Sequence, residues 1–192
     1  MAGMAVVPGE GKAAQIGTRI TRASLNRVKD QRTLLQAIAT LRASRVELEL
    51  TIVGFDTLSG EMQSMAAAMG LTSDIRFLGE LTHAELRPWF ERADILVMAS
   101  RHEAGPLVML EAAAAGVPTV GTRVGHIADH SPDCALAVPI GDAAALADAI
   151  ALLARDEDRR LKLAVSAQAL AMRIDADFTA RTFLEGYRGM QR

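Results

Sequence analysis

The chain has 192 residues, of which 50% are hydrophobic, and this is enough for one domain with a buried core. Its net charge of −2 and its 4% of aromatic residues give no reason to expect nucleic acid as a partner. The single cysteine, Cys134, excludes an internal disulfide, and no apolar run is long enough to be a transmembrane segment, so we expect a cytoplasmic domain.

Short β-prone segments alternate with helical ones after residues 1–18, a Gly/Ala-rich stretch that we expect to be a linker or tail. The expected strands are 19–25, 47–53, 74–78, 94–98, 118–121 and 135–138. The expected helices are 31–43, 59–69, 82–92, 106–115, 142–154, 156–172 and a closing helix at about 175–188. This alternation predicts right-handed βαβ units, and hence an α/β, Rossmann-like domain over residues 19–192 with helices on both faces of a parallel sheet.

Two glutamates stand where a ligand of such a sheet would bind. Ligands of open parallel sheets bind beyond the carboxyl ends of the strands, and Ser100–Gly105 follows the fourth expected strand. The helix that starts at Pro106 offers free N–H groups and the positive end of its dipole to an anion or a hydroxyl. Glu103 precedes this helix and Glu111 lies within it, so both can contact one ligand with paired hydroxyls, such as a sugar or a ribose.

Each glutamate also has a purely structural explanation. Glu103 could serve only as a favourable charge at a helix N-terminus, which contributes about 0.3–1 kcal/mol. Glu111 could be a solvated helix residue, but its neighbours from Leu107 to Ala115 are apolar nearly all round, which indicates a buried helix. Because an unpartnered buried carboxylate is costly, we expect a ligand hydroxyl or a basic side chain to contact Glu111.

Several segments together resemble one enzyme family. SRHEAGPLVMLEAAAAGVPTVGTRVGHIADH, at 100–130, resembles the E-x7-E region of retaining glycosyltransferases of family 4, also called group 1, which have the GT-B fold. The resemblance continues in the family's order through ASLNRVKDQRTLLQAIATL, LELTIVG, IRFLGELTHAELRPWFERADILVMAS and VPTVGTRVG, and ADFTARTFLEGYRGM resembles the closing helix. It spans roughly residues 19–188 and implies the C-terminal, donor-binding half of a GT-B fold.

The resemblance implies a nucleotide-diphosphate sugar as donor substrate, with no cofactor and no metal. Glu103 would contact the donor sugar and Lys29 the diphosphate, which makes these two the candidate catalytic residues. Glu111 would bind the ribose, and the base would lie near Leu78. The remaining candidate donor contacts are Ala104, Gly105, Leu107, Val108, Arg27 and His126.

The sequence departs from the family pattern at two positions. The arginine expected about five residues before the lysine is Ser24 here, and serine does not reproduce an arginine's bidentate hold on phosphate. Arg22 or Arg27 would have to substitute. The usual Gly-Gly after the fifth strand is Gly125-His126, and His126 is either a hydrogen-bond donor to phosphate or sugar or a plain loop histidine.

The largest departure is length. Members of the family have a second Rossmann-like domain of similar size, which precedes this one and binds the acceptor, and no part of this sequence corresponds to it. We therefore expect a glycosyltransferase donor-binding domain that is inactive alone and transfers a sugar with retention only in the full enzyme. One alternative is a non-catalytic nucleotide-sugar-binding half-subunit that needs a separate N-terminal domain chain. Another is a different nucleotide-binding α/β protein such as a dehydrogenase domain, which the absence of G-x-G-x-x-G after the first strand disfavours.

Overall fold

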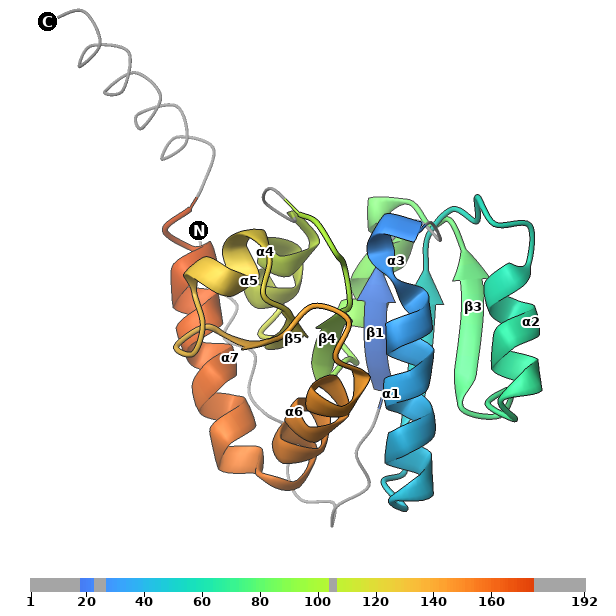
Figure 1. The fold of residues 1–192 in the computed structure, drawn as a ribbon. Coiled ribbons are helices and arrows are strands. Elements are labelled where there is room, and N and C mark those ends of the chain that lie inside the picture. Colours follow the sequence, from blue (N-terminus) through green and yellow to red (C-terminus); the bar gives the residue numbers. More distant parts are fainter. Residues whose placement is uncertain (1–17, 23–26, 104–106, 175–192) are drawn as a thin grey trace, which may run out of the picture.

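The computed structural model describes residues 18–22, 27–103 and 107–174, and these form a single parallel sheet with helices on both faces (Figure 1). The strands are β1 (Thr18–Arg22), β2 (Glu49–Val53), β3 (Ile75–Gly79), β4 (Ile95–Met98), β5 (Thr119–Thr122) and β6 (Ala135–Val138). The helices are η1 (Arg27–Lys29), α1 (Gln31–Ala43), α2 (Glu61–Ala68), α3 (His83–Phe90), α4 (Leu107–Ala114), α5 (Gly125–Asp129), α6 (Ala143–Arg155) and α7 (Glu157–Ala171). The predicted α/β class is confirmed, whereas the predicted closing helix and all of the predicted tail except Thr18 lie outside the described residues.

The strands form because their side chains can be buried on both faces of the sheet. Every residue of β4 and β5 is buried, and β2 is buried from Leu50 to Val53. Near-continuous burial of this kind is typical of parallel strands covered by helices on both sides. Gly121 in β5 lies opposite Met98 of β4 and leaves room for its backbone carbonyl.

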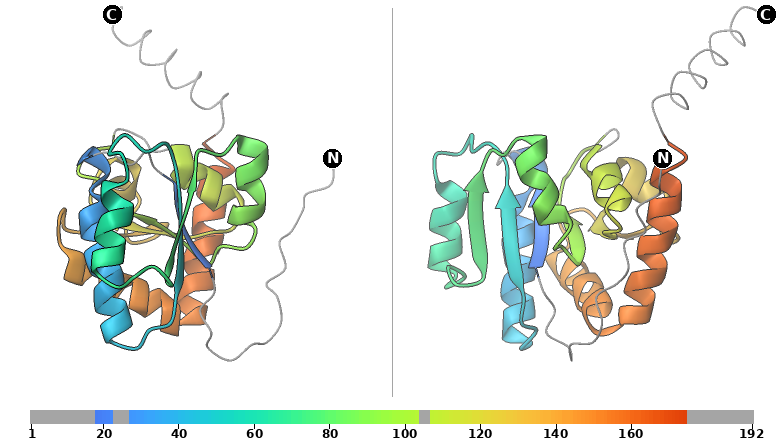
Figure 2. Two further views of the ribbon diagram at one scale, coloured as in Figure 1. Left: turned by 90° about the vertical axis from the view of Figure 1, so that its right-hand side faces the viewer. Right: turned by 180° about the vertical axis from the view of Figure 1, so that it is seen from behind.

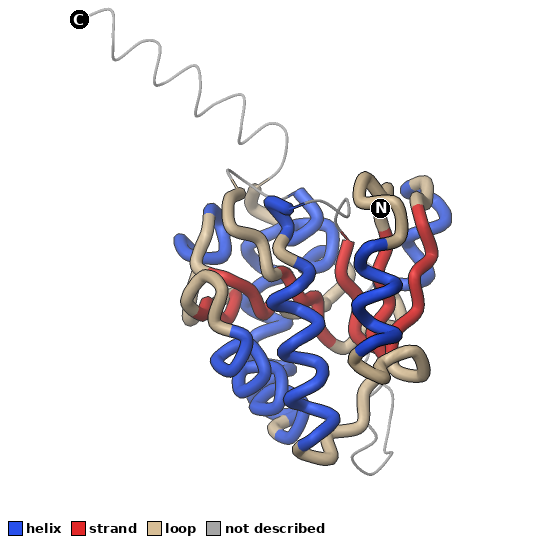
Figure 3. The backbone as a smooth tube through the Cα atoms, turned by 45° about the vertical axis from the view of Figure 1, so that its right-hand side comes forward, coloured by secondary structure: helices blue, strands red, loops and turns tan. Residues whose placement is uncertain are grey.

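Two layers of helices enclose the sheet. One apolar core lies under α1, α2 and α6 and includes the predicted stripe of α1: Leu34, Leu35, Ile38 and Leu41. The other lies under α3, α4 and α5 and is built around Leu86, Phe90, Met109 and Ile127. Viewed along the sheet, α1 and α2 lie on one side and α3 on the other, so the strands form a middle layer (Figure 2, Figure 3). Helix α7 packs against α4, where Gln168 Nε2 donates to the Ala114 carbonyl at 3.1 Å.

The strand order reverses at the centre of the sheet. The order is β3-β2-β1-β4-β5-β6, so the chain runs outward from β1 to β3, returns to the other side of β1, and runs outward again to β6. The loop after β1 leads to α1 on one face, and the loop after β4 leads to α4 on the other. Loops that part in this way leave a crevice at the carboxyl edge, where ligands of open α/β sheets bind.

Candidate functional site

The two predicted catalytic residues meet at this reversal. Lys29 ends the η1 turn after β1, Glu103 follows β4, and the Lys29 ammonium donates to Glu103 Oε1. Ser100 Oγ donates to the same carboxylate oxygen at 2.7 Å, and the Glu103 side chain is only 11% exposed. Because β1 and β4 are neighbouring strands, residues far apart in the sequence form one cation–carboxylate cluster.

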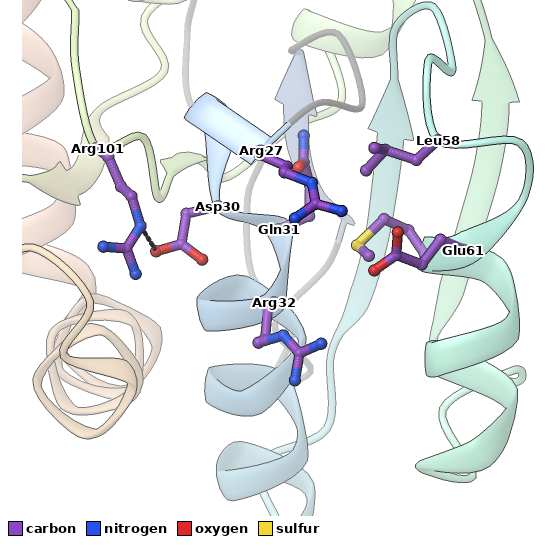
Figure 4. A pocket seen from close by; sticks show the side chains of 8 residues that line it. Arg27, Asp30, Gln31, Arg32, Leu58, Glu61 and Arg101 are labelled. Carbon is purple, nitrogen blue, oxygen red and sulfur yellow. Dashed lines mark ion pairs between the residues drawn. The ribbon is translucent and has the colours of Figure 1, made fainter.

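The backbone around this cluster is held by contacts between loops. The Arg101 N–H donates to the Val28 carbonyl at 2.8 Å, and Thr122 Oγ1 donates to the Ser100 carbonyl within the buried interior. Asp30, beside Lys29, lies 2.9 Å from Arg101 Nε, and Figure 4 shows the two charged groups facing each other. The Glu103 loop is therefore attached to the loop after β1 and to the last residue of β5.

Glu111 lies on α4 and is contacted by a basic side chain. His83 Nδ1 is 3.3 Å from Glu111 Oε1, a pair that is charged on both sides only when the imidazole is protonated. The prediction that α4 is buried nearly all round is wrong, because Leu107 is 64% exposed and Glu111 is 21% exposed. Met109, Ala112 and Ala113 are buried, whereas Glu111 is half-buried and Leu107, at the start of the helix, is exposed.

His83 is placed by the start of α3. Thr82 caps this helix: its hydroxyl accepts from the Glu85 N–H, and Glu85 Oε2 accepts from the Thr82 N–H at 2.9 Å and from its hydroxyl at 2.8 Å. The backbone N–H of Thr82, followed by its hydroxyl, lowers the pKa of the Glu85 carboxyl. This capping box fixes the first turn, and so the position of His83 opposite Glu111.

The loop after β2 is organised by one carboxylate. Asp56 accepts from the N–H groups of Leu58 at 2.7 Å and Gly60 at 2.9 Å, and from Gln63 Nε2 at 3.2 Å. The Leu58 N–H is the largest influence that lowers the pKa of Asp56, against a smaller rise from burial. Asp56 is thus committed to the turn that leads into α2, and Phe55 beside it is exposed at the carboxyl edge of the sheet.

The other predicted donor contacts lie at the same edge but differ in their surroundings. Leu78 and Val108 are half-buried against the core under α3 and α4, whereas Leu107 is exposed. His126 lies in α5, a short helix that was not predicted, where its Nδ1 is 3.7 Å from Asp129 Oδ2. Ala104, Gly105 and Ser24 lie outside the described residues.

Arg27 is exposed and lines a recess of about 200 Å³ between the N-terminal ends of α1 and α2 (Figure 4). The residues around it are Arg27, Asp30, Gln31, Arg32, Leu58, Glu61, Met62 and Arg101. Asp30, Arg101 and His83 were missed by the sequence reasoning. Their only signal was their place in the sequence: Asp30 follows Lys29, Arg101 precedes Glu103, and His83 comes shortly after the end of β3.

Within the described ranges, no group of three His, Cys, Asp or Glu side chains could hold a metal ion. No helix in that part of the chain is long and apolar enough to cross a membrane. The charged side chains described at the site are Lys29, Glu103 and Glu111, with the Asp30–Arg101 pair beside them.

Comparison with known proteins decides the family. Residues 18–156 match the family model described as glycosyl transferases group 1, which is more than half of the chain. The chain belongs to the group 1 glycosyltransferases. As a group 1 glycosyltransferase it is 34% identical over 175 residues to the D-inositol 3-phosphate glycosyltransferase of Corynebacterium urealyticum. That alignment covers 86% of this chain and 41% of the relative, so the chain spans less than half the length of this relative.

Solved structures place this group 1 glycosyltransferase chain within its family's architecture. The Anabaena protein HepE, in complex with UDP and glucose, superposes with a TM-score of 0.77 at 20% identity, over 90% of this chain and 48% of that one. The C-terminal domain of a group 1 glycosyl transferase from Francisella tularensis superposes with a TM-score of 0.69 at 22% identity, over 84% of this chain and 86% of that one. The predicted Rossmann-like, C-terminal half of a GT-B fold is confirmed.

Proposed function

We propose that the carboxyl edge of the sheet binds a nucleotide-diphosphate sugar, which makes this chain the donor-binding domain of a retaining glycosyltransferase. The contact between Lys29 and Glu103 where the strand order reverses is the observation that carries this proposal. It joins a cation that suits a diphosphate to a carboxylate that suits sugar hydroxyls. Glu111 follows on α4, where its side chain is 21% exposed.

Each group has a definite role in this proposal. Among the described residues, Lys29 and Ser100 both donate to Glu103 Oε1, so Oε2 is left to accept from a sugar hydroxyl. Glu111, which His83 contacts at Oε1, accepts from the ribose diol, since a carboxylate oxygen suits paired hydroxyls. Lys29 faces the diphosphate. The base lies beside Leu78, and the supporting contacts come from Ala104, Gly105, Leu107, Val108, Arg27 and His126.

In the transfer, the bond between the anomeric carbon and the β-phosphate oxygen breaks and the nucleoside diphosphate leaves with the bonding electrons. The acceptor oxygen bonds to the same face of the anomeric carbon, and its proton passes to an oxygen of the leaving diphosphate. Lys29 stabilises the charge that develops on the leaving diphosphate, and such preorganised charge is usually a large part of catalysis. The acceptor-binding surface belongs to a second domain of the full enzyme.

A second candidate is a half-subunit that holds the donor and works with a separate N-terminal domain chain. An assay of sugar transfer by the isolated chain tests this candidate, because sustained turnover without a partner contradicts the half-subunit.

Isothermal titration of the chain with UDP, GDP, ADP and their sugar conjugates tests donor binding directly. We expect Lys29→Met to weaken diphosphate binding about tenfold or more, since hydrogen bonds to charged groups contribute about 1.5–3 kcal/mol. Lys162→Met, on the exposed surface of α7, is the matched control and should leave the affinity unchanged. A folded chain that binds none of these nucleotides would contradict the proposal.

A further inference from the structure

Asp30 is a buried carboxylate that the proposed donor contacts do not use. It is 7% exposed, and no other Asp or Glu in the described part of the chain is buried to this degree. Its backbone is in the left-handed region, with φ 45° and ψ 48°, where only a few non-glycine residues lie. A buried charge in such a conformation calls for a specific reason.

The charge of Asp30 is balanced mainly by Arg101. Asp30 Oδ1 accepts a long bond of 3.4 Å from the Thr33 N–H at the start of α1. Asp30 Oδ2 lies 2.9 Å from Arg101 Nε, but the geometry is that of an ion pair and not of a directional hydrogen bond. The Arg101 side chain is 60% exposed, so its guanidinium bridges the buried carboxylate and solvent.

This pair lies beside the Lys29–Glu103 pair and crosses the same gap. Lys29 and Asp30 belong to the loop after β1, whereas Arg101 and Glu103 belong to the loop after β4, so each loop contributes one cation and one anion. The Arg101 N–H bond to the Val28 carbonyl joins the two loops as well. Figure 4 shows Asp30 directed toward Arg101, and both side chains line the recess that Arg27 also lines.

Helix capping alone does not explain an aspartate here. Asparagine caps helices about as well and tolerates the left-handed region, and it avoids burying a charge. The charge of Asp30 is therefore needed for its pairing with Arg101. The consequence of that pairing falls on the adjacent Lys29.

We propose that Asp30 and Arg101 form a positioning pair, which holds Lys29 at the diphosphate while itself making no contact with the donor. This inference rests on the proposed function. A bound diphosphate competes with Glu103 for the Lys29 ammonium, so donor binding weakens one of the contacts that join the two loops. The Asp30–Arg101 pair keeps the loops joined during that exchange.

Asp30→Asn tests the pair with little change in shape, because it keeps the cap and tolerates the backbone conformation. The measured quantity is the ratio of the UMP and UDP dissociation constants, obtained by isothermal titration, which reports the contribution of the second phosphate. We expect Asp30→Asn to lower this ratio by a factor of about 2 to 30, and Arg101→Gln to lower it by a similar factor. In Arg101→Lys, which keeps the positive charge, the ratio should recover in part. Asp142→Asn, at the cap of α6 where Asp142 Oδ1 accepts from the Ala145 N–H at 2.9 Å, is the matched control and should leave the ratio unchanged.

A merely structural role predicts something different. It would lower the melting temperature and weaken UMP and UDP equally, with the ratio constant. Arg101→Gln changes a surface side chain, so it provides a folded variant even if Asp30→Asn is unstable. In a Lys29→Met background, Asp30→Asn should have no further effect on the ratio.

The results separate this inference from the proposed function. An unmodified chain that prefers UDP to UMP, with the same preference in folded Asp30→Asn and Arg101→Gln, overturns the positioning pair and leaves the proposed donor site intact. An unmodified chain that binds none of UDP, GDP and ADP contradicts the proposed function, and the positioning pair with it.

Discussion

Replacing Gly121 by alanine should destabilise the protein through two close contacts. A Cβ at this position would lie 2.7 Å from the Met98 carbonyl oxygen and 2.8 Å from Ile127 Cδ1. Without these contacts the change would stabilise by about 0.4–1 kcal/mol, because alanine lowers the entropy of the unfolded chain. The backbone oxygen of a neighbouring strand cannot rotate away, so the overpacking cost of about 1–3 kcal/mol decides the sign.

Thermal unfolding followed by circular dichroism measures this effect. With the entropic gain subtracted, the net cost is up to about 2.6 kcal/mol, and since 1 kcal/mol shifts the melting temperature of a chain of this size by about 2–4 °C, we expect a fall of up to roughly 10 °C. Ile127→Val removes the Cδ1 atom and should make the double variant less unstable than the sum of the two single changes. A melting temperature for Gly121→Ala equal to or above that of the unmodified chain would refute the steric argument.

Three further predictions concern side chains near the site or elsewhere on the surface. His83→Ala should weaken UDP binding by less than about fivefold, because exposed ion pairs contribute at most about 1 kcal/mol, whereas Glu111→Gln should weaken it more; equal effects in titration would contradict this order. Thr82→Ala should lower the melting temperature more at pH 7 than at pH 3. The reason is that the depressed pKa of Glu85 provides stability above its unfolded value near about 4.3, and that stability is lost as the pH falls through the folded pKa. Burial, followed by the charge of Asp133, raises the pKa of the Cys134 thiol, so at pH 8 it should react with a chromogenic disulfide more slowly than an unhindered thiol; equal rates would exclude this.

The elements with a strong pattern were predicted well. The range 31–43 for α1 is the observed one, because its apolar stripe marks the buried face of the helix; the structure adds the cap at Asp30. Strand β6 also matches at Ala135–Val138. By contrast, α5 has only five residues and too little periodicity to distinguish it from a loop, so it was missed.

The contacts of the site depend on information that alternation of strands and helices does not contain. That rule predicts a parallel sheet, but not that β4 pairs with β1, and this pairing alone brings Arg101 to Asp30. The error about α4 has a similar origin. Its alanines and leucines read as buried on all sides, yet the sheet and α7 cover only part of the helix, and Leu107 is left exposed.

The all-parallel sheet also places its strand-to-helix loops at one edge and its helix-to-strand turns at the other. Every connection from a helix to the next strand lies at the amino edge, on the far side of the sheet from Lys29 and Glu103. The turn after α1, around the exposed Ser44 and Arg45, is one of these. A fluorophore or an affinity tag attached there would leave the whole carboxyl edge unobstructed, so this chain can be immobilised or labelled through one edge while nucleotides are presented to the other.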